Sequence, residues 1–200
     1  MLRSSSSSNT SAKGKRGRRQ RPQGIRREES VPADEIALPD AELLLPRLAA
    51  ELREHVTPSA AMIGLYTGGA WLAERLHPML DLKDPLGLMD IAFYRDDYHK
   101  EGLKHDPKRT RIPFDVDGRD LLLVDDVLYT GRTVRAAMNE LFDYGRPRSI
   151  SLVILADRGG RQLPICAQHC GSVVQVPEGM RLRLKRAAGG TLRLELERAA

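Results

Sequence analysis

The stretch Leu121–Thr133, LLLVDDVLYTGRT, constrains the fold more than any other part of the chain. Its first four residues, LLLV, are all apolar, and a run without alternation is typical of a central strand in a parallel sheet. Two adjacent carboxylates, Asp125 and Asp126, follow at once, although aspartate is depleted in strands and like charges repel. The pattern places both acids at the carboxyl end of a buried strand, where parallel sheets bind their ligands.

A short polar turn connects these acids to a predicted helix. Thr130, Gly131, Arg132 and Thr133 come directly before an apolar stripe at helical spacing. Backbone N–H groups at a helix start bind phosphate, and glycine allows a close approach. Since two carboxylates can accept hydrogen bonds from vicinal hydroxyls, the stretch indicates a clamp for ribose 5-phosphate. The alternative is a capped turn, with Thr133 as N-cap and both acids solvated, which the combined spacing disfavours.

Strands alternate with helices along the chain, which predicts an α/β fold with a central, mainly parallel sheet flanked by helices. Helices are expected at Asp40–His55 and Thr133–Tyr144, the second ending at Gly145; strands at Leu88–Asp97, Leu121–Val124, Ile150–Leu155 and Val173–Val176; and a strand, a Gly-rich turn and a helix within Ala61–Leu76. A turn at Asp117-Gly118 is expected between two strands. Leucine alternates with charge around Gly189-Gly190, which predicts a C-terminal antiparallel hairpin.

Charge divides the chain into two parts. Residues 1–30 hold nine Lys/Arg and two Glu, a net charge of +7, whereas the remainder has a net charge of −2. Residues 1–33 have almost no apolar side chains, so we expect a disordered, basic Ser/Arg-rich tail before one folded domain at 34–200. The block Lys13–Arg27 can attract RNA or DNA without sequence preference, but a solvated tail is the favoured interpretation.

Composition excludes several classes of protein. A chain of 200 residues can bury a real core in one domain, and no apolar run approaches the length of a membrane span. The N-terminus lacks the apolar core of a signal peptide. Cys166 and Cys170 cannot build a disulfide framework, so we expect a cytoplasmic protein. With His169 they offer too few ligands for structural zinc, and ordinary, partly buried cysteines are favoured.

The stretch LLLVDDVLYTGRT resembles the phosphoribosyl-pyrophosphate (PRPP) motif of the type I phosphoribosyltransferases. The blocks DIAFYRDD, VDDVLYTGRTVRAAMNEL, DYGRPRSISL and DRGGRQLPI resemble the PyrR family of pyrimidine operon regulators, from about residue 40 to about residue 185. This resemblance implies the type I phosphoribosyltransferase fold, with a small hood beside the central sheet.

The resemblance also implies roles for individual residues. Asp125 and Asp126 would be catalytic, and the PRPP and nucleotide site would comprise Asp125, Asp126, Val127, Leu128, Tyr129, Thr130, Gly131, Arg132 and Thr133. Thr67, Gly68 and Gly69 would form the pyrophosphate loop; Arg95, Asp96 and Asp97 would border the metal and pyrophosphate; Asp157, Arg158 and Gly159 would lie beside the base; and Arg47 and Arg161 would be possible RNA contacts.

The activity implied by this resemblance is that of a uracil phosphoribosyltransferase, which converts uracil and PRPP into UMP and diphosphate with Mg²⁺. UMP or UTP sensing, binding to a pyrimidine-operon mRNA leader and a homo-oligomeric state are also implied. Residues 98–113 would form a lid that closes over the substrate, with the cations Lys100, Lys104, Lys108, Arg109 and Arg111.

Two departures from the family pattern leave alternatives open. Many family members have Thr-Arg-Gly where this chain has Gly68 in the second position, and the lost cation predicts weaker PRPP binding. Pro46, Ala50, Gly160 and Cys166 stand where polar or basic groups are expected for RNA binding. A regulator that senses nucleotides with little catalysis is therefore an alternative to the enzyme. A purine phosphoribosyltransferase is a weaker one, because the blocks beyond the PRPP motif fit the pyrimidine regulators better.

Overall fold

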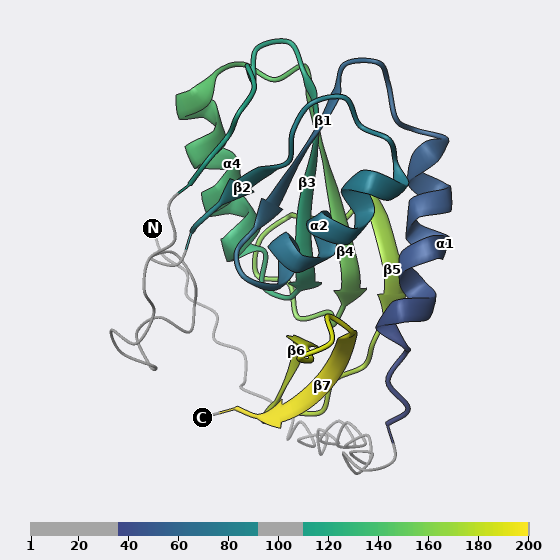
Figure 1. The fold of residues 1–200 in the computed structure, drawn as a ribbon. Coiled ribbons are helices and arrows are strands. Elements are labelled where there is room, and N and C mark those ends of the chain that lie inside the picture. The colour runs from purple at the N-terminus through teal and green to yellow at the C-terminus, as the bar shows by residue number, and fades with distance from the viewer. Residues whose placement is uncertain (1–35, 92–109, 200) are drawn as a thin grey trace, which may run out of the picture.

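A computed structural model describes residues 36–91 and 110–199 of the chain (Figure 1). Its helices and strands are α1 (Ala41–Arg53), β1 (Ala60–Leu65), α2 (Gly68–Met79), β2 (Gly87–Met89), β3 (Asp120–Leu128), α4 (Arg132–Tyr144), β4 (Ser149–Asp157), β5 (His169–Val173), β6 (Met180–Arg186) and β7 (Leu192–Arg198). The tail predicted at 1–33 and most of the predicted lid lie outside the described residues. Within the described residues, no helix has the length and apolar character needed to cross a membrane.

The central sheet has five strands in the order β2-β1-β3-β4-β5, and every adjacent pair is parallel. β3 lies in the middle, where Leu121 pairs with Ala61 of β1 and with Ile150 of β4. All six residues of β1 are buried, as expected for a strand covered on both sides. The prediction of an α/β fold with a mainly parallel sheet is confirmed.

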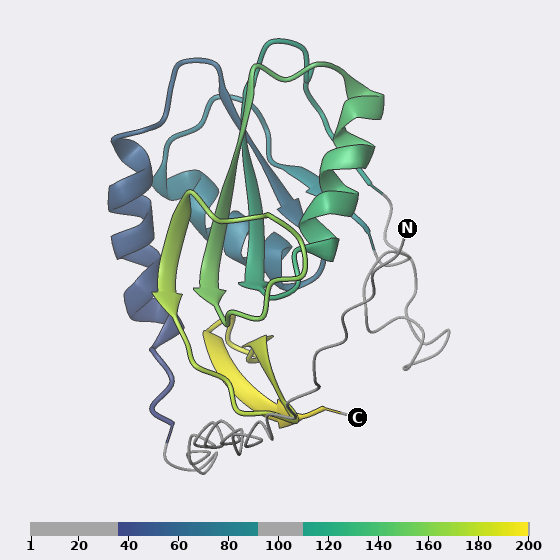
Figure 2. The same ribbon diagram turned by 180° about the vertical axis from the view of Figure 1, so that it is seen from behind.

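Helices cover both faces of the sheet. α1 and α2 lie on one face and α4 lies on the other (Figures 1 and 2). Leu45 and Leu72 belong to the apolar cluster on the first face, whereas Leu123 and Leu141 belong to the cluster on the second. β3 supplies alternating residues to both clusters, which is why its apolar residues show no alternation in the sequence.

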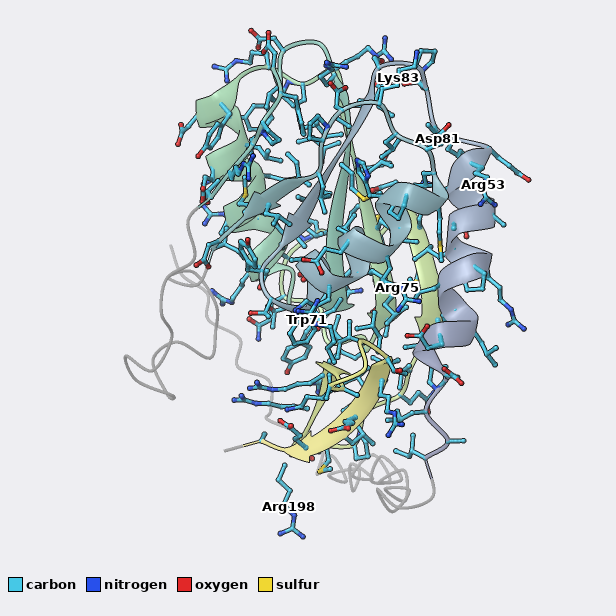
Figure 3. All side chains as sticks on the ribbon, in the orientation of Figure 1. Arg53, Trp71, Arg75, Asp81, Lys83 and Arg198 are labelled. Atoms are coloured by element: carbon cyan, nitrogen blue, oxygen red, sulfur yellow. The ribbon has the colours of Figure 1, made fainter. Side chains whose placement is uncertain are left out.

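The C-terminal hairpin is confirmed, and it lies beside the carboxyl ends of the sheet strands (Figure 1). The leucines of one side are buried against the α1 and α2 face; they are Leu182, Leu184, Leu192 and Leu194. Arg186 attaches the hairpin to α2, because its guanidinium lies 5.0 Å from the Trp71 ring centroid and its Nη1 is 2.8 Å from Glu74. Figure 3 shows Trp71 on the side of α2 that faces the hairpin. The hairpin is thereby held over the end of the sheet where ligands are expected.

Three strands differ clearly from the sequence prediction. β2 is Gly87–Met89, although the sequence predicts a strand over Leu88–Asp97. β3 continues through both acids to Leu128, so the strand is longer than its apolar part. The last sheet strand is His169–Val173 rather than Val173–Val176. Its residue Gly171 lies so close to β4 that a Cβ atom would be 2.7 Å from the backbone oxygen of Leu155. Because glycine gives no strand signal, the sequence pattern missed most of this strand.

The strand expected before the turn at Asp117 does not form. The described residues there make a single isolated bridge, between Leu88 and Arg111, instead of a ladder. Asp115 Oδ1 accepts a hydrogen bond from the backbone N–H of Asp117 at 3.0 Å, a local turn that competes with strand pairing. Gly118 has φ +69, which confirms the turn itself.

Candidate active site

The two predicted catalytic carboxylates lie near the carboxyl end of β3. Asp125 is buried, with 3% of its surface exposed, and its Oδ1 accepts a hydrogen bond from the backbone N–H of Asp126 at 3.0 Å. Asp126 is half-buried, and among residues 36–91 and 110–199 no hydrogen bond or ion pair engages its carboxylate. An ionised carboxylate only accepts hydrogen bonds, so Asp126 is well placed to accept from the hydroxyls of a ligand.

The first Gly-rich turn packs directly against these acids. The peptide bond before Thr67 is cis, and α2 begins at Gly68. A Cβ atom at Gly68 would lie 2.4 Å from the carboxyl carbon of Asp126, and one at Gly69 would lie 2.5 Å from the backbone oxygen of Val124. The second contact is with fixed backbone, whereas the first is with a side chain that can move. The structure thus brings the predicted pyrophosphate loop and the predicted ribose-binding acids into contact.

The segment Tyr129–Thr133 connects β3 to the first turn of α4, and we call it the phosphoribosyl loop. Gly131 has φ +89, a left-handed conformation that favours glycine, and is the N-cap of α4. The alternative in which Thr133 is the N-cap is therefore wrong. Thr130 is buried, and its hydroxyl oxygen accepts a hydrogen bond from the backbone N–H of Arg132 at 3.3 Å. The first N–H groups of α4 consequently lie beside the acids, at the same edge of the sheet.

The residues predicted to lie beside the base, Asp157–Gly159, follow the neighbouring strand at the same edge. They are called the base-side segment. The backbone N–H of Arg158 donates to the oxygen of Leu128 at 3.1 Å, and its guanidinium lies 4.1 Å from the ring centroid of Tyr129. Asp157 Oδ1 accepts from the backbone N–H of Gly159 at 2.8 Å. The end of β4 is therefore joined to the end of β3 by direct contacts.

Sequence reasoning missed the segment 161–165 as part of this site. The backbone N–H groups of Gln162 and Leu163 donate to the oxygen of Thr130 at 3.0 and 3.2 Å. Gln162 Oε1 accepts from Arg132 Nε at 3.0 Å, and Ile165 packs against Gly131. These contacts support the phosphoribosyl loop from behind. The sequence RQLPI does not indicate this role, because backbone groups and ordinary apolar side chains make most of the contacts.

Several predicted residues are not brought to the site by the described structure. Arg95, Asp96, Asp97, Lys100, Lys104, Lys108 and Arg109 lie outside the described residues. Arg111 is exposed, and its backbone pairs with Leu88. Of the two possible RNA contacts, Arg47 is exposed on α1, whereas the guanidinium of Arg161 points inward and donates to protein oxygens.

Comparison with known proteins shows the family to which this chain belongs. The family model described as the phosphoribosyl transferase domain matches residues 33–178. A protein of Pseudomonas paraeruginosa named "Bifunctional protein PyrR" is 44% identical over 153 residues, which cover 74% of this chain and 90% of that protein. The chain belongs to the PyrR family of phosphoribosyltransferases. A PyrR protein of Nitrosococcus oceani is 51% identical over 126 residues, covering 62% of this chain and 71% of the relative.

Solved structures support the fold of this PyrR family member. A hypoxanthine phosphoribosyltransferase of Staphylococcus aureus superposes with a TM-score of 0.54 and 21% identity, covering 72% of this chain and 79% of the other. At that identity the likeness shows the type I phosphoribosyltransferase fold and carries no information on the base.

The acidic residues of this family member fit a magnesium ion that is shared with a substrate. Among the described residues, no group of three or more His, Cys, Asp or Glu side chains could hold a metal. Mg²⁺ usually keeps several waters and binds one or two carboxylates together with substrate phosphates. Asp125 and Asp126 supply oxygen ligands of that kind, which suits a metal arriving with PRPP rather than a closed cage.

The expected burial of the cysteines holds for one of the two. Cys170 is partly buried, and this burial raises the pKa of its thiol, whereas Cys166 is exposed. His169 is buried, and its Nδ1 lies 2.7 Å from Glu51 Oε1, so it joins β5 to α1. Trp71 of α2 packs against the apolar cluster on the first face of the sheet and lies beside Arg186 of the hairpin.

Proposed function

We propose that this protein is a uracil phosphoribosyltransferase that forms UMP and diphosphate from uracil and PRPP. The observation that carries the proposal is the contact of Asp126 with the Gly-rich turn, beside the phosphoribosyl loop, in a member of the PyrR family. Three chemically different surfaces meet there: two helix starts, a pair of acids and the end of β4. They correspond to the phosphates, the ribose and the base of the substrates.

Each part of PRPP has a proposed partner. The N-terminus of α4 and the phosphoribosyl loop bind the 5-phosphate through backbone N–H groups and the Thr130 and Thr133 hydroxyls. Asp125 and Asp126 accept hydrogen bonds from the ribose hydroxyls. The start of α2, at Gly68 and Gly69, offers backbone N–H groups to the diphosphate. Because both helix starts present partial positive charge, they favour the two anionic ends of the substrate.

The reacting carbon develops positive charge as its bond to diphosphate loosens, as in glycoside chemistry. The carboxylate of Asp126 lies beside the ribose in this proposal and stabilises that charge electrostatically. Mg²⁺ bound with PRPP would neutralise charge on the leaving diphosphate. Asp125, which is buried, orients Asp126 by accepting its backbone N–H.

Gly68 is compatible with this activity. Its missing side chain leaves the space in which the Asp126 carboxylate lies, and the backbone N–H groups of α2 remain. The loss of a cation at this position therefore predicts a weaker hold on diphosphate rather than an absent reaction.

The proposal includes regulation of pyrimidine genes by a cytoplasmic homo-oligomer that senses UMP or UTP and binds a pyrimidine-operon mRNA leader. The exposed Arg47 and the basic residues of the tail at 1–33 are the candidate contacts. The basic residues of this tail would contribute phosphate contacts, which position RNA without reading its sequence.

The decisive experiment incubates the purified full chain with PRPP and Mg²⁺ and with either uracil or hypoxanthine. We expect UMP from uracil and no nucleotide from hypoxanthine. Formation of IMP would show that the base substrate is a purine and not uracil. Retained UMP binding without any product, at high enzyme concentration, would instead establish a nucleotide-sensing regulator without catalysis.

RNA binding is tested separately, by gel shift with the cognate pyrimidine-gene leader and with a scrambled RNA of equal length. A preference for the leader supports regulation, and equal affinity contradicts it. Deletion of residues 1–33 is expected to flatten the salt dependence of RNA binding and to leave nucleotide affinity unchanged.

A further inference from the structure

Arg161 lies behind the proposed site, and its guanidinium is directed into the protein. Only 23% of its side chain is exposed. Its Nε donates to the backbone oxygen of Ile165 at 3.1 Å, and its Nη1 donates to the oxygens of Leu128 and Gly159, each at 3.3 Å. The guanidinium also bonds the backbone oxygen of Tyr129 and forms an ion pair with the carboxylate of Asp157.

These five oxygens come from three separate segments. Leu128 and Tyr129 connect β3 to the phosphoribosyl loop, Asp157 and Gly159 belong to the base-side segment, and Ile165 belongs to the connection between β4 and β5. Figure 2 shows that this connection runs along the α4 side of the sheet before it enters β5. A guanidinium presents its donors in a rigid plane, so one side chain fixes the relative position of all three segments.

The Tyr129 ring gives the same segments a second connection. The Arg158 guanidinium lies 4.1 Å from the ring centroid, within cation–π range. Gly160 lies against the ring, because a Cβ atom there would be 2.5 Å from the Tyr129 Cε2 atom. Gly160 also has φ +74, which favours glycine on conformational grounds. Residues 158–161 therefore contact Tyr129 through a cation, a bare backbone and a hydrogen bond.

We propose that Arg161 is a positioning residue for the phosphoribosyl loop, and that it couples this loop to the base-side segment through Asp157 and Tyr129. The loop must aim several N–H groups at one phosphate, and small misplacements in such a site weaken binding strongly. Because the same guanidinium holds both segments, ordering one segment around its ligand favours the bound geometry of the other. Such a coupling is reciprocal: uracil tightens the phosphate side by the factor by which the phosphate side tightens uracil.

This inference rests on the proposed function for the identity of the base, and its test uses a ligand that cannot react. Ribose 5-phosphate has the ribose and phosphate of PRPP without the leaving group. Its affinity for the full chain is measured by calorimetry with and without uracil. We expect uracil to tighten ribose 5-phosphate binding by about fivefold, within the usual range of such couplings.

The test variant is Arg161→Met, and the matched control is Arg135→Met, which removes an exposed arginine from α4. We expect Arg161→Met to weaken ribose 5-phosphate binding by about tenfold and to abolish the effect of uracil. Arg161→Lys keeps the charge without the planar fork. Relative to Arg161→Met, we expect it to recover more of the folding stability than of the effect of uracil on ribose 5-phosphate binding. An unchanged affinity and an unchanged effect of uracil in either Arg161 variant would overturn the proposal.

A double-mutant cycle keeps the test independent of Arg161, whose methionine variant loses five hydrogen-bonding contacts. Gly160→Ala adds both a backbone cost and a contact with the ring, whereas in a Tyr129→Ala background only the backbone cost remains. We expect Gly160→Ala to weaken ribose 5-phosphate binding about tenfold alone and less than about twofold in that background. Additive effects would refute the role of the ring. A wild-type protein that binds ribose 5-phosphate but forms no UMP would contradict the proposed function and leave the positioning role standing.

Discussion

The two ends of β3 use aspartate in opposite ways. At the N-terminal end, the carboxylate of Asp120 accepts hydrogen bonds from Thr57 at 2.6 Å and Ser149 at 2.7 Å, and it pairs with Arg148. At the other end, the carboxylate of Asp126 faces a glycine and has no hydrogen-bonding partner among residues 36–91 and 110–199. The two residues are on the same strand.

The difference separates stability from function. The partners of Asp120 hold its pKa well below the usual range, with the hydrogen bond from Arg148 as the largest cause. Its acceptor capacity is used within the protein, so it connects β3 to the turn before β1 and to the start of β4. Asp126 has acceptor capacity left for a ligand. Residue type is thus uninformative by itself, and the partners decide the role.

The largest expected effect comes from Asp126→Asn. The substitution keeps the shape and removes the charge, so we expect kcat for UMP formation to fall by about 10²–10³-fold. The melting temperature should remain within about 1 °C of the wild type, since no group in the described part of the chain hydrogen-bonds to this carboxylate. Asp143→Asn on the exposed face of α4 is the control. A large loss of stability in Asp126→Asn would contradict the proposed difference between a structural Asp120 and a ligand-binding Asp126.

The converse result is expected for Asp120→Asn. Its amide cannot replace a carboxylate that accepts from several donors and Arg148, and we expect unfolding to become easier by about 1–3 kcal/mol. The kcat of the folded fraction should be unchanged, because Asp120 lies at the edge of the sheet opposite the site. Urea titration and an assay on the same preparation measure both quantities. A fall in kcat without a loss of stability would contradict the assignment.

The pH dependence of stability sharpens the comparison further. The pKa of Asp120 is lower in the folded state than in the unfolded state, so its contribution is present above the unfolded pKa, about 4, and is lost as the pH falls below it. The wild-type protein should therefore lose stability faster than Asp120→Asn below about pH 4, by up to about 1.4 kcal/mol per pH unit. Parallel urea midpoints for the two proteins across this range would count against the ion pair.

The smallest effect is expected for Gly68→Ala. Its Cβ atom would meet the mobile Asp126 carboxylate, so we expect KM for PRPP to rise about threefold with little change in stability, a small cost for a contact that can relax. Gly69→Ala meets the backbone oxygen of Val124 instead and should destabilise the fold. Equal losses of stability in the two variants would show that Gly68 serves packing alone.

The alternation of strands and helices, the central strand and the C-terminal hairpin could be predicted from apolar periodicity. β5 could not, because Gly171 is required by the close approach of Leu155, and a glycine gives no strand signal. Of the strand pairing, only the hairpin partners could be inferred, since the order β2-β1-β3-β4-β5 depends on contacts between distant segments.

The nearness of the acids to Gly131 could be inferred, because one motif carries them in nearly consecutive residues. The Gly-rich turn at Thr67–Gly69 is distant in the sequence, and only the family resemblance placed it beside Asp126. Arg161 could be recognised only as a cation on a polar segment, which is equally typical of a nucleic-acid contact. Its partners are mainly backbone oxygens, and backbone groups leave no trace in a sequence. The support behind a site is therefore harder to predict than the groups that face the ligand.

The chain contains a single tryptophan, and Trp71 lies where α2 meets the hairpin (Figure 3). The Arg186 guanidinium, 5.0 Å from its ring centroid, places a positive charge beside the indole only while the hairpin is docked. Indole emission responds to nearby charge and to water, so the intrinsic fluorescence of the unmodified protein is a direct optical measure of hairpin docking. Titrations that follow Trp71 fluorescence can report whether each substrate changes the docking of the hairpin, without any added label.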